Sequence, residues 1–428
     1  MRFSTLLLLC ASTCLAQPPD PGGAWVLKIT RYGESESRRV KFEQKDGRYS
    51  ARIFGLSFAG TVSGGRVEFA CTNEEEGAKK PCGSLTGVVA GAEMNGDGKI
   101  FDDSFTWRAR RPAARPADSP RRHEFVPAVF HHHFAGSIAP ALHVYPGDTV
   151  HVTTVDAGGV DEKGVKRTQG GNPLSGPFYV EGAFPGDTLV VRLNRVRLNR
   201  DIAGMYSDSI AAGALDPYFG RDEKRIKDFD SMWKLDRERG TASLSKPTDK
   251  LKNFTIPLRP MLGCIAVAPP GGQSFRSGYL GRFGGNMDYN QLREGVTLYF
   301  PVFQEGALLF VGDGHAAQGD GELTGNALET SMDVEFTVDL IEGKSLGQTR
   351  AENDEYVMVM GIAGSLDDAL RSATTGMARW LQEEYKLNSA ETAMVLGSSM
   401  RYDIAEVVDP QVHIVAKVAK TALSQISK

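Results

Sequence analysis

The sequence predicts a mainly β protein with helices at its C-terminal end, an α+β class in which a small β domain precedes a larger β-sandwich or barrel core. Two observations carry this prediction. Segments in which apolar and polar residues alternate recur from about residue 24, as strands with one buried face require. Apolar residues at helical spacing become clear only after residue 365. A chain of 428 residues is long enough for two or three domains.

Residues 1–16 are predicted to be a secretory signal. Arg2 precedes the apolar run Leu6–Leu9, and the small residues before Gln17 suit cleavage after Ala16. This run is too short to span a bilayer, and no later stretch is apolar and long enough to do so. We therefore expect a soluble protein that is exported to the periplasm or the extracellular space.

Residues 24–110 are predicted to form the small β domain. Their alternating segments are interrupted at Ser63-Gly64-Gly65, which indicates a hairpin turn. Cys71 and Cys82 lie close together in the chain, so an oxidising compartment would favour a disulfide between them. Cys264 lies in an apolar strand pattern and is expected to be a buried, inert thiol.

A linker rich in proline and arginine, residues 111–124, is expected to lead into a second unit at 125–428. This unit contains a short internal repeat, "YPGDTVHVTTVD" at 145–156 and "FPGDTLVVRLNR" at 184–195. In both, Pro-Gly-Asp-Thr makes a tight turn and then starts an alternating strand, which favours stacked or barrel-like β structure. Residues 217–256 are charged and irregular and are expected to form a surface insertion.

The C-terminal part is predicted to be helical. Residues 365–387 begin with Ser365 as a helix cap and have apolar residues at helical spacing. Residues 388–400 repeat the pattern, with Asn388 or Ser389 as the cap. A final amphipathic segment covers about 410–425.

Charge and motifs exclude several function classes. The net charge of −4, from 49 basic and 53 acidic residues, gives no electrostatic case for nucleic acid or an anionic membrane as a partner. No phosphate loop or dinucleotide fingerprint stands between a strand and a helix start, and no serine lies in a Gly-x-Ser-x-Gly elbow. A chemical function must therefore come from other residues.

Acidic and imidazole groups gather in loops that follow predicted strands. "GDGHAAQGDGE" at 312–322 combines them with five glycines, which let a backbone approach a ligand closely. Carboxylates beside a histidine can hold a divalent cation, with one carboxylate left as a general base for water. Oxygen-rich ligation with one imidazole permits zinc, manganese or calcium. The candidates are Asp156, Glu181, Asp313, His315, Glu322 and Glu329.

Each candidate has a structural alternative. The aspartates can stabilise tight turns through their own backbone, and Glu181 can point outward from its strand or be buried and paired. In "VFHHHFAG", His131 and His133 share a face if the segment is a strand, which makes His133 a further candidate metal ligand. The alternative there is a polar strand end.

Six segments of the chain form a distinctive set: "YPGDTVHVTTVDAGG", "NPLSGPFYVEGAFPGDTLVV", "PMLGCIAVAP", "GGNMD", "FVGDGHAAQGDGELTGNALETSMDVEF" and "RYDIAEVVDPQVHIVAKVAK". Together they resemble the acetamidase/formamidase family. The resemblance runs in order from about residue 130 to the C-terminus and leaves residues 24–110 outside it. It implies a mainly β fold with some helices, hydrolysis of small linear amides to a carboxylate and ammonia, and a bound divalent metal, zinc or calcium. The resemblance also implies that the site residues are Asp156, Glu181, Asp313, His315 and Glu322, each of which stands in a matching segment.

On this basis we expect His315 to hold a cation with carboxylates among Asp313, Asp156 and Glu181. Glu181 or Glu322 would then move the proton of the attacking water, and the ligand and base roles can be exchanged among these residues. The expected partner is a small amide substrate, and the protein can associate with itself. Two alternatives stay open: a hydrolase of the same fold that acts on another acyl substrate, and an exported binding protein without chemistry.

Overall fold

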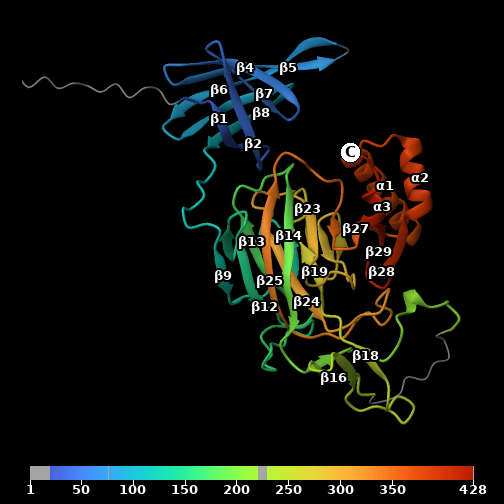
Figure 1. The fold of residues 1–428 in the computed structure, drawn as a ribbon. Coiled ribbons are helices and arrows are strands. Elements are labelled where there is room, and N and C mark those ends of the chain that lie inside the picture. The colour runs from blue at the N-terminus through green and yellow to red at the C-terminus, as the bar shows by residue number, and fades with distance from the viewer. Residues whose placement is uncertain (1–19, 76, 220–228, 428) are drawn as a thin grey trace, which may run out of the picture. The chain divides into compact units, whose positions relative to one another are not determined.

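The computed structural model describes residues 20–75, 77–219 and 229–427, and it divides into two compact units, Met1–Pro112 and Ala113–Lys428 (Figure 1). The predicted signal peptide lies outside the described residues. Among the helices of the described part, none combines the length and hydropathy needed to cross a bilayer. The predicted class is confirmed: strands dominate both units, and the helices longer than one turn lie near the C-terminus.

The first unit is a closed barrel in which each strand pairs antiparallel with the next and β8 returns to β1. The alternation seen in the sequence gives every strand one buried apolar face. Gly64 and Gly65 both have positive φ, as the predicted two-residue hairpin turn requires. The predicted disulfide between Cys71 and Cys82 is also confirmed. The strands are β1 (Gly23–Arg31), β2 (Glu34–Lys45), β3 (Arg48–Ile53), β4 (Leu56–Ser63), β5 (Arg66–Glu75), β6 (Ala78–Ala90), β7 (Glu93–Ile100) and β8 (Asp103–Arg110).

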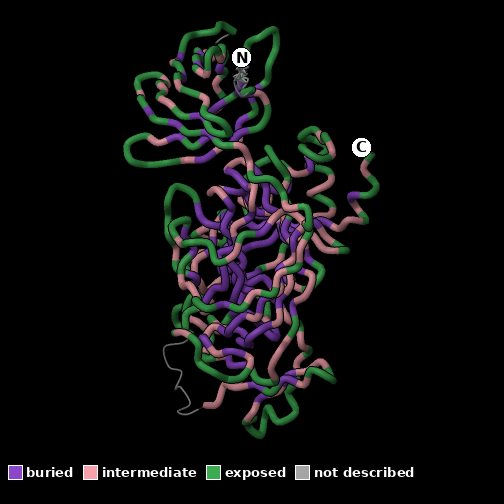
Figure 2. The backbone as a smooth tube through the Cα atoms, turned by 90° about the vertical axis from the view of Figure 1, so that its left-hand side faces the viewer, coloured by how far each residue is buried: buried purple, intermediate pink, exposed green. Residues whose placement is uncertain are grey.

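The second unit is built on two large sheets that share one hydrophobic core (Figures 1 and 2). Phe178 of one sheet meets Phe336 of the other edge to face, with ring centroids 5.2 Å apart. The first sheet has the order β28 (Arg401–Glu406), β29 (Val412–Ala419), β27 (Tyr356–Ala363), β26 (Arg350–Glu352), β23 (Thr297–Pro301), β14 (Thr188–Leu198), β25 (Met332–Ile341), β12 (Thr149–Thr153), β9 (Arg122–Phe125). The second has the order β11 (Leu142–Val144), β13 (Leu174–Val180), β24 (Leu309–His315), β19 (Met261–Ala266), β22 (Gly284–Asn286), β21 (Leu280–Gly281).

The two Pro-Gly-Asp-Thr turns lead into neighbouring parts of the first sheet, because β12 and β14 both pair with β25. Their aspartates, Asp148 and Asp187, are buried and accept hydrogen bonds from backbone N–H groups. Residues 122–124, predicted as the end of the linker, lie in β9 and pair with β12. Two further short strands, β10 (His133–Ala135) and β20 (Ser274–Arg276), form a separate pair.

The region expected to be an irregular insertion, 217–256, contains strands, so that prediction was wrong for its described part. It supplies most of a four-stranded sheet whose apolar side chains pack on Ala316, Ala317 and Leu328. Residues 220–228 lie outside the described residues. The strands are β15 (Ile202–Gly204), β16 (Met232–Asp236), β17 (Thr241–Leu244) and β18 (Thr255–Pro257), and the turn η1 (Ala212–Ala214) precedes β16.

The predicted helices are confirmed as α1 (Leu366–Tyr385) and α2 (Ser389–Ser399). Ser365 caps α1, and Asn388 caps α2 in a reciprocal pair with Glu391. α1 packs on β27 and β29 and buries its apolar stripe there. The amphipathic segment at 410–425 is mainly strand β29, followed by the short helix α3 (Lys420–Leu423). Its alternating residues Val412–Val418 find partners in β27 on one side and β28 on the other.

Candidate functional site

His315 stands at the centre of a buried group of carboxylates. It ends β24, an inner strand of the second sheet, and its side chain is 1% exposed. Its Nε2 atom lies near one oxygen from each of four carboxylates. The distances are 3.2 Å to Glu329 Oε2, 3.5 Å to Asp313 Oδ1, 3.8 Å to Asp288 Oδ1 and 4.0 Å to Glu322 Oε1.

The group extends beyond these five residues. Three sets of side chains each offer ligand atoms within 4.8 Å of one another in the described part of the chain, and the sets share His315 or Asp288. The third set adds Glu406 and Asp409, which lie at and beyond the end of β28. We refer to the whole as the acidic cluster: Asp288, Asp313, His315, Glu322, Glu329, Glu406 and Asp409.

The backbone around the acidic cluster is strained, and neighbouring glycines make room for it. The φ angle is positive at three of its members, at 37° for Asp288, 58° for Asp313 and 46° for Glu322. Residues other than glycine rarely adopt this backbone conformation. A Cβ atom at Gly263, on the adjacent strand β19, would lie 2.2 Å from Asp288 Oδ1 and 2.7 Å from Asp313 Oδ2. Glycine at position 263 is therefore required by the close approach of the two carboxylates.

Burial and the neighbouring charges strongly shift the pKa values of the groups in the acidic cluster. Burial, together with Glu322 and Asp313, raises the pKa of Asp288 well above its usual value. Burial also raises the pKa of Glu322 well above its usual value, although His315 acts against this. Burial is the largest cause for Glu329 and Asp409 too, whose pKa values rise to about 7 and about 8. Burial lowers the pKa of His315, but Glu329 and Asp313 outweigh it and hold that pKa well above its ordinary value.

Gln318 determines which nitrogen of His315 faces the carboxylates. The Gln318 amide nitrogen donates to the backbone oxygens of Asp288 and Ala405, so its Oε1 is the atom that meets His315 Nδ1, at 2.9 Å. An amide oxygen only accepts, so Nδ1 carries the proton. Nε2 is therefore the nitrogen that faces the four carboxylates, and in the neutral ring its lone pair is available to a cation there.

Several polar atoms of the acidic cluster have no hydrogen-bond partner, although they are fully buried. They converge instead of pairing, and leaving so many buried groups unpaired is costly unless a cation satisfies them. Imidazole and carboxylate donors are ligands for zinc, and the excess of oxygen atoms also suits calcium. The residues thus fit a divalent metal. The unpaired atoms are both carboxylate oxygens of Asp288, Asp313 Oδ1, His315 Nε2, Glu329 Oε2 and Glu406 Oε2.

Four of the candidates from the sequence, Asp313, His315, Glu322 and Glu329, meet in the acidic cluster. Asp156 is buried but is satisfied otherwise, by the Val160 backbone N–H and by Arg200, with which it forms an ion pair. The sets of converging ligand atoms in the described residues do not include it.

Glu181 and His133 occupy other places. Glu181 follows β13 and accepts a hydrogen bond from Nδ1 of His143 at 2.7 Å, and the side chain of His143 is 56% exposed. His133 is exposed on β10, where its backbone pairs with Arg276. Neither belongs to the sets of converging ligand atoms among the described residues.

Sequence reasoning did not single out Asp288, Glu406 or Asp409, and it noted Glu329 without giving it a role. Asp288, Glu406 and Asp409 nevertheless stand in sequence motifs that could have indicated them. Asp288 closes "GGNMD" after a glycine-rich strand, and Glu406 and Asp409 stand in "EVVD" at the end of β28. What the sequence could not indicate is that sheet order brings these strand ends together around His315.

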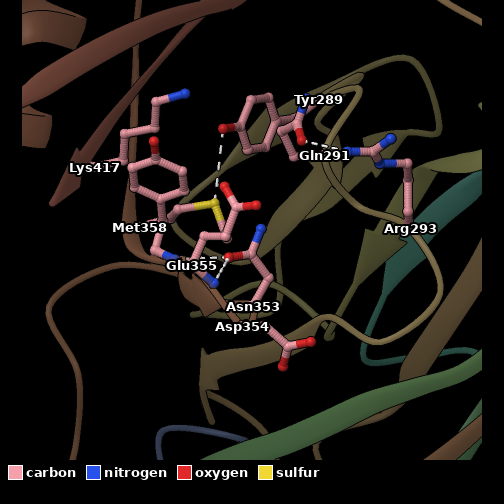
Figure 3. A pocket seen from close by; sticks show the side chains of 9 residues that line it. Tyr289, Gln291, Arg293, Asn353, Asp354, Glu355, Met358 and Lys417 are labelled. Carbon is pink, nitrogen blue, oxygen red and sulfur yellow. Dashed lines mark hydrogen bonds between the residues drawn. The ribbon is translucent and has the colours of Figure 1, made fainter. Parts of the chain in front are cut away.

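Two hollows lie near the acidic cluster, and only one reaches it. A polar hollow of about 390 Å³ is lined by Tyr289, Arg293, Glu355 and Lys417 among others, and Figure 3 shows these side chains around it. Its described lining includes no member of the acidic cluster. The other, of about 480 Å³, includes Glu322 and Gln318 in its lining. The second hollow is therefore the one of the two that contacts the acidic cluster.

The sequence profile of the acetamidase/formamidase family matches residues 118–272 and 280–408. A formamidase from Methylophilus methylotrophus is 28% identical over 257 residues, which are 46% of this chain and 61% of that protein. An acetamidase from Mycolicibacterium smegmatis is 27% identical over 220 residues, 40% of this chain and 53% of that protein. The chain thus spans between half and two thirds of the length of these curated relatives.

Solved structures agree with the fold. The crystal structure of an acetamidase from Yersinia enterocolitica superposes with a TM-score of 0.62 at 27% identity, covering 74% of this chain and 96% of that one. A predicted acetamidase/formamidase from Thermoanaerobacter tengcongensis gives 0.60 at 28% identity, covering 72% and 98%. The expected likeness to the fold of this family is therefore confirmed.

Proposed function

This chain belongs to the acetamidase/formamidase family, and we propose that it hydrolyses the carbon–nitrogen bond of a linear amide to a carboxylate and ammonia. The single observation that supports this most strongly is the acidic cluster, in which buried carboxylates surround His315 and one of them, Glu322, lines a hollow. Perturbed titratable groups beside a cavity are typical of catalytic sites.

We further propose that the acidic cluster holds a divalent cation, zinc or calcium. His315 Nε2 with Asp313 and Asp288 supplies one set of donors, and Glu329, 3.2 Å from Nε2, would add a further donor and leave Glu322 for proton transfer. A cation bound there would polarise the amide carbonyl and make water more acidic. Gln318 supports this role, because its bond to Nδ1 leaves Nε2 as the ligand atom.

Glu322 is the proposed proton-transfer group. It is the one carboxylate of the acidic cluster in the lining of the hollow of about 480 Å³, and it lies 4.0 Å from His315 Nε2. Burial raises its pKa, which suits a group that takes a proton from attacking water and delivers it to the departing nitrogen. The carbon–nitrogen bond breaks, a carbon–oxygen bond forms, and the water proton leaves with ammonia.

The test is ammonia release from formamide and acetamide by the purified full chain and by Glu322→Gln. We expect release by the native protein and a loss of about 10²-fold or more in the variant, because the isosteric amide cannot accept a proton. Glu68→Gln, on the exposed face of barrel strand β5, is the matched control and should behave like the native protein.

Each other outcome of this test points to a different function. Equal turnover by Glu322→Gln would remove Glu322 from the mechanism. Amide binding without release of ammonia would identify a binding protein instead of an enzyme, and turnover of esters alone would identify a hydrolase of another acyl substrate.

Export is also proposed. The signal-like residues 1–16 motivate it, and the disulfide Cys71–Cys82 supports it, since disulfides persist in oxidising compartments. Mass spectrometry of protein from the medium or the periplasm should find an N-terminus at Gln17. Protein that stays in the cytoplasm with Met1 intact would contradict the proposal.

A further inference from the structure

The hollow that reaches Glu322 is apolar over most of its wall. Its volume is about 480 Å³, and we call it the apolar hollow. Its lining also contains polar groups: Gln318 and Glu322, which connect it to the acidic cluster, and Arg259 and Asp320, which are exposed. The large apolar side chains that line it are Met205, Trp233, Phe254, Ile256, Leu323 and Leu328.

The small four-stranded sheet holds one wall in place. Trp233 of β16 is only 5% exposed, because it packs in a satellite core with Leu244 and with Ala316 and Ala317, which follow His315 directly. A backbone bridge between Gly204 and Glu329 fastens the same sheet to the acidic cluster. The apolar wall is thus built on residues adjacent to the candidate catalytic groups.

The rim of the apolar hollow exposes side chains that water solvates poorly. Phe254 is 47% exposed and Leu323 is 45% exposed, and both line the apolar hollow. A neighbouring hollow of about 240 Å³ shares Met205, Trp233 and Phe254 with it and extends the apolar surface. Exposed apolar residues that gather at a cavity, instead of being scattered, indicate a binding surface.

The volume exceeds what formamide or acetamide needs. Pockets of roughly 300–1,000 Å³ are the size that encloses drug-sized ligands, whereas formamide has three heavy atoms and acetamide four. Such a molecule at Glu322 would leave the aromatic wall without a contact. Each methylene that the wall buries would favour binding by about fourfold.

We propose that the substrate is a primary amide whose acyl group is apolar, an alkyl chain of several carbons or an arylalkyl group. Its carboxamide faces Glu322 and the acidic cluster, and its acyl group fills the space between Trp233, Phe254 and Leu323. This inference rests on the proposed amidase function and goes beyond it, because it states which amides are preferred. The chemistry is unchanged: water adds to the carbonyl carbon, the carbon–nitrogen bond breaks, and ammonia leaves with the transferred proton.

The test compares kcat/KM for acetamide, butyramide, hexanamide and phenylacetamide with the purified full chain. We expect kcat/KM to rise along the alkyl series and to be about 10²-fold higher for hexanamide than for acetamide, at about fourfold per methylene. Phe254→Ala should lower the hexanamide-to-acetamide ratio by about tenfold. Phe101→Ala, which removes an exposed aromatic ring from the barrel, is the matched control and should keep the native ratio.

The outcomes separate this inference from the function on which it rests. If acetamide is turned over as well as hexanamide, and Phe254→Ala leaves the ratio unchanged, the substrate class is wrong while the amidase function stands. If no amide of the series releases ammonia, the amidase function itself fails. A ratio that falls equally in Phe101→Ala would also overturn the role of the apolar hollow.

Discussion

The two units of this chain fill their interiors in opposite ways. In the barrel the buried side chains are almost all apolar, and among its described residues the buried polar one is Ser37. Charges stay on the outer face of each strand, and a disulfide joins β5 to β6. The second unit has a larger apolar core, yet it also buries a whole series of carboxylates. Burying charge rarely increases stability, so these carboxylates need another explanation.

The second unit itself contains two kinds of buried carboxylate. Asp148 and Asp187, in the Pro-Gly-Asp-Thr turns, accept from backbone N–H groups and complete their turns. Hydrogen bonds from Arg121 and Tyr145 outweigh burial and lower the pKa of Asp148. In the acidic cluster the oxygens of Asp288 have no partner, and burial raises its pKa. The available donors, more than burial, distinguish a structural aspartate from a functional one.

The largest predicted effect is that of Asp313→Asn. Asparagine tolerates the positive φ of this position, so the backbone is kept while one negative charge is lost from the acidic cluster. We expect ammonia release to fall by about 10³-fold. In the metal-free protein the free energy of unfolding should not decrease, because repulsion among the carboxylates is relieved. Urea unfolding monitored alongside activity checks both, and a large loss of stability would mean that Asp313 is structural.

The next effect concerns the barrel. Cys71→Ser opens a disulfide that joins residues 11 apart in the sequence, and loop-closure entropy predicts a loss of about 3 kcal/mol. Hydrogen exchange on the full chain should show faster opening of amides in β5 and β6, while amides of β19 and β24 keep their protection. Equal acceleration in both units would show that the barrel does not unfold separately.

A turn aspartate should behave in the opposite way to Asp313. Asp187→Ala leaves the backbone N–H groups of Phe184 and Gly343 without their acceptor. We expect a loss of about 2 kcal/mol in unfolding free energy, with kcat/KM for amides kept within about twofold. If this variant instead lost activity while remaining stable, the distinction between the two kinds of aspartate would be contradicted.

The smallest predicted effect is a pH dependence that belongs to the second unit, because all eight histidines follow residue 120. Burial lowers the pKa of His413 to about 4, against an ordinary value near 6.5. Between these values the unfolded chain binds the proton and the folded chain does not, so stability falls as the pH falls through this window. By itself, His413 should cost roughly 1 kcal/mol of stability between pH 7 and pH 5.5, whereas the raised pKa values of Glu329 and Asp409 act in the opposite direction.

The matched variant for this pH effect is His413→Gln, which keeps a donor for the Met287 backbone oxygen. Urea unfolding at the two pH values should show that lowering the pH destabilises the native protein relative to the variant by about 1 kcal/mol. The same change in both would assign the pH dependence to other groups.

Local patterns in the sequence predicted much of the fold. Strand alternation, the Gly64-Gly65 turn and the caps of α1 and α2 depend on neighbouring residues, and the sequence contains those. Segment 410–425 was misread because an alternating amphipathic run becomes a strand only when partners such as β27 and β28 are present. The pairing partners are distant in sequence and leave no local mark.

The site was predictable only around His315. Asp313 and Glu322 lie within a few residues of it, so one motif contained all three. Asp288, Glu406 and Asp409 join them through the sheet order, which no spacing reveals. Conversely, Asp156 and Glu181 stand in the motifs that resemble the family, but the sequence could not show that Arg200 and His143 are their partners.

The measurement that tests the central claim most directly is metal content together with ammonia release, before and after chelation, on the purified full chain. The proposed role of the acidic cluster predicts about one or more equivalents of a divalent cation. Activity should disappear with the chelator and return with zinc or with calcium, but not in Asp313→Asn. Full ammonia release by protein that elemental analysis shows to be metal-free would contradict it, and the buried carboxylates around His315 would then have to act as acids and bases alone.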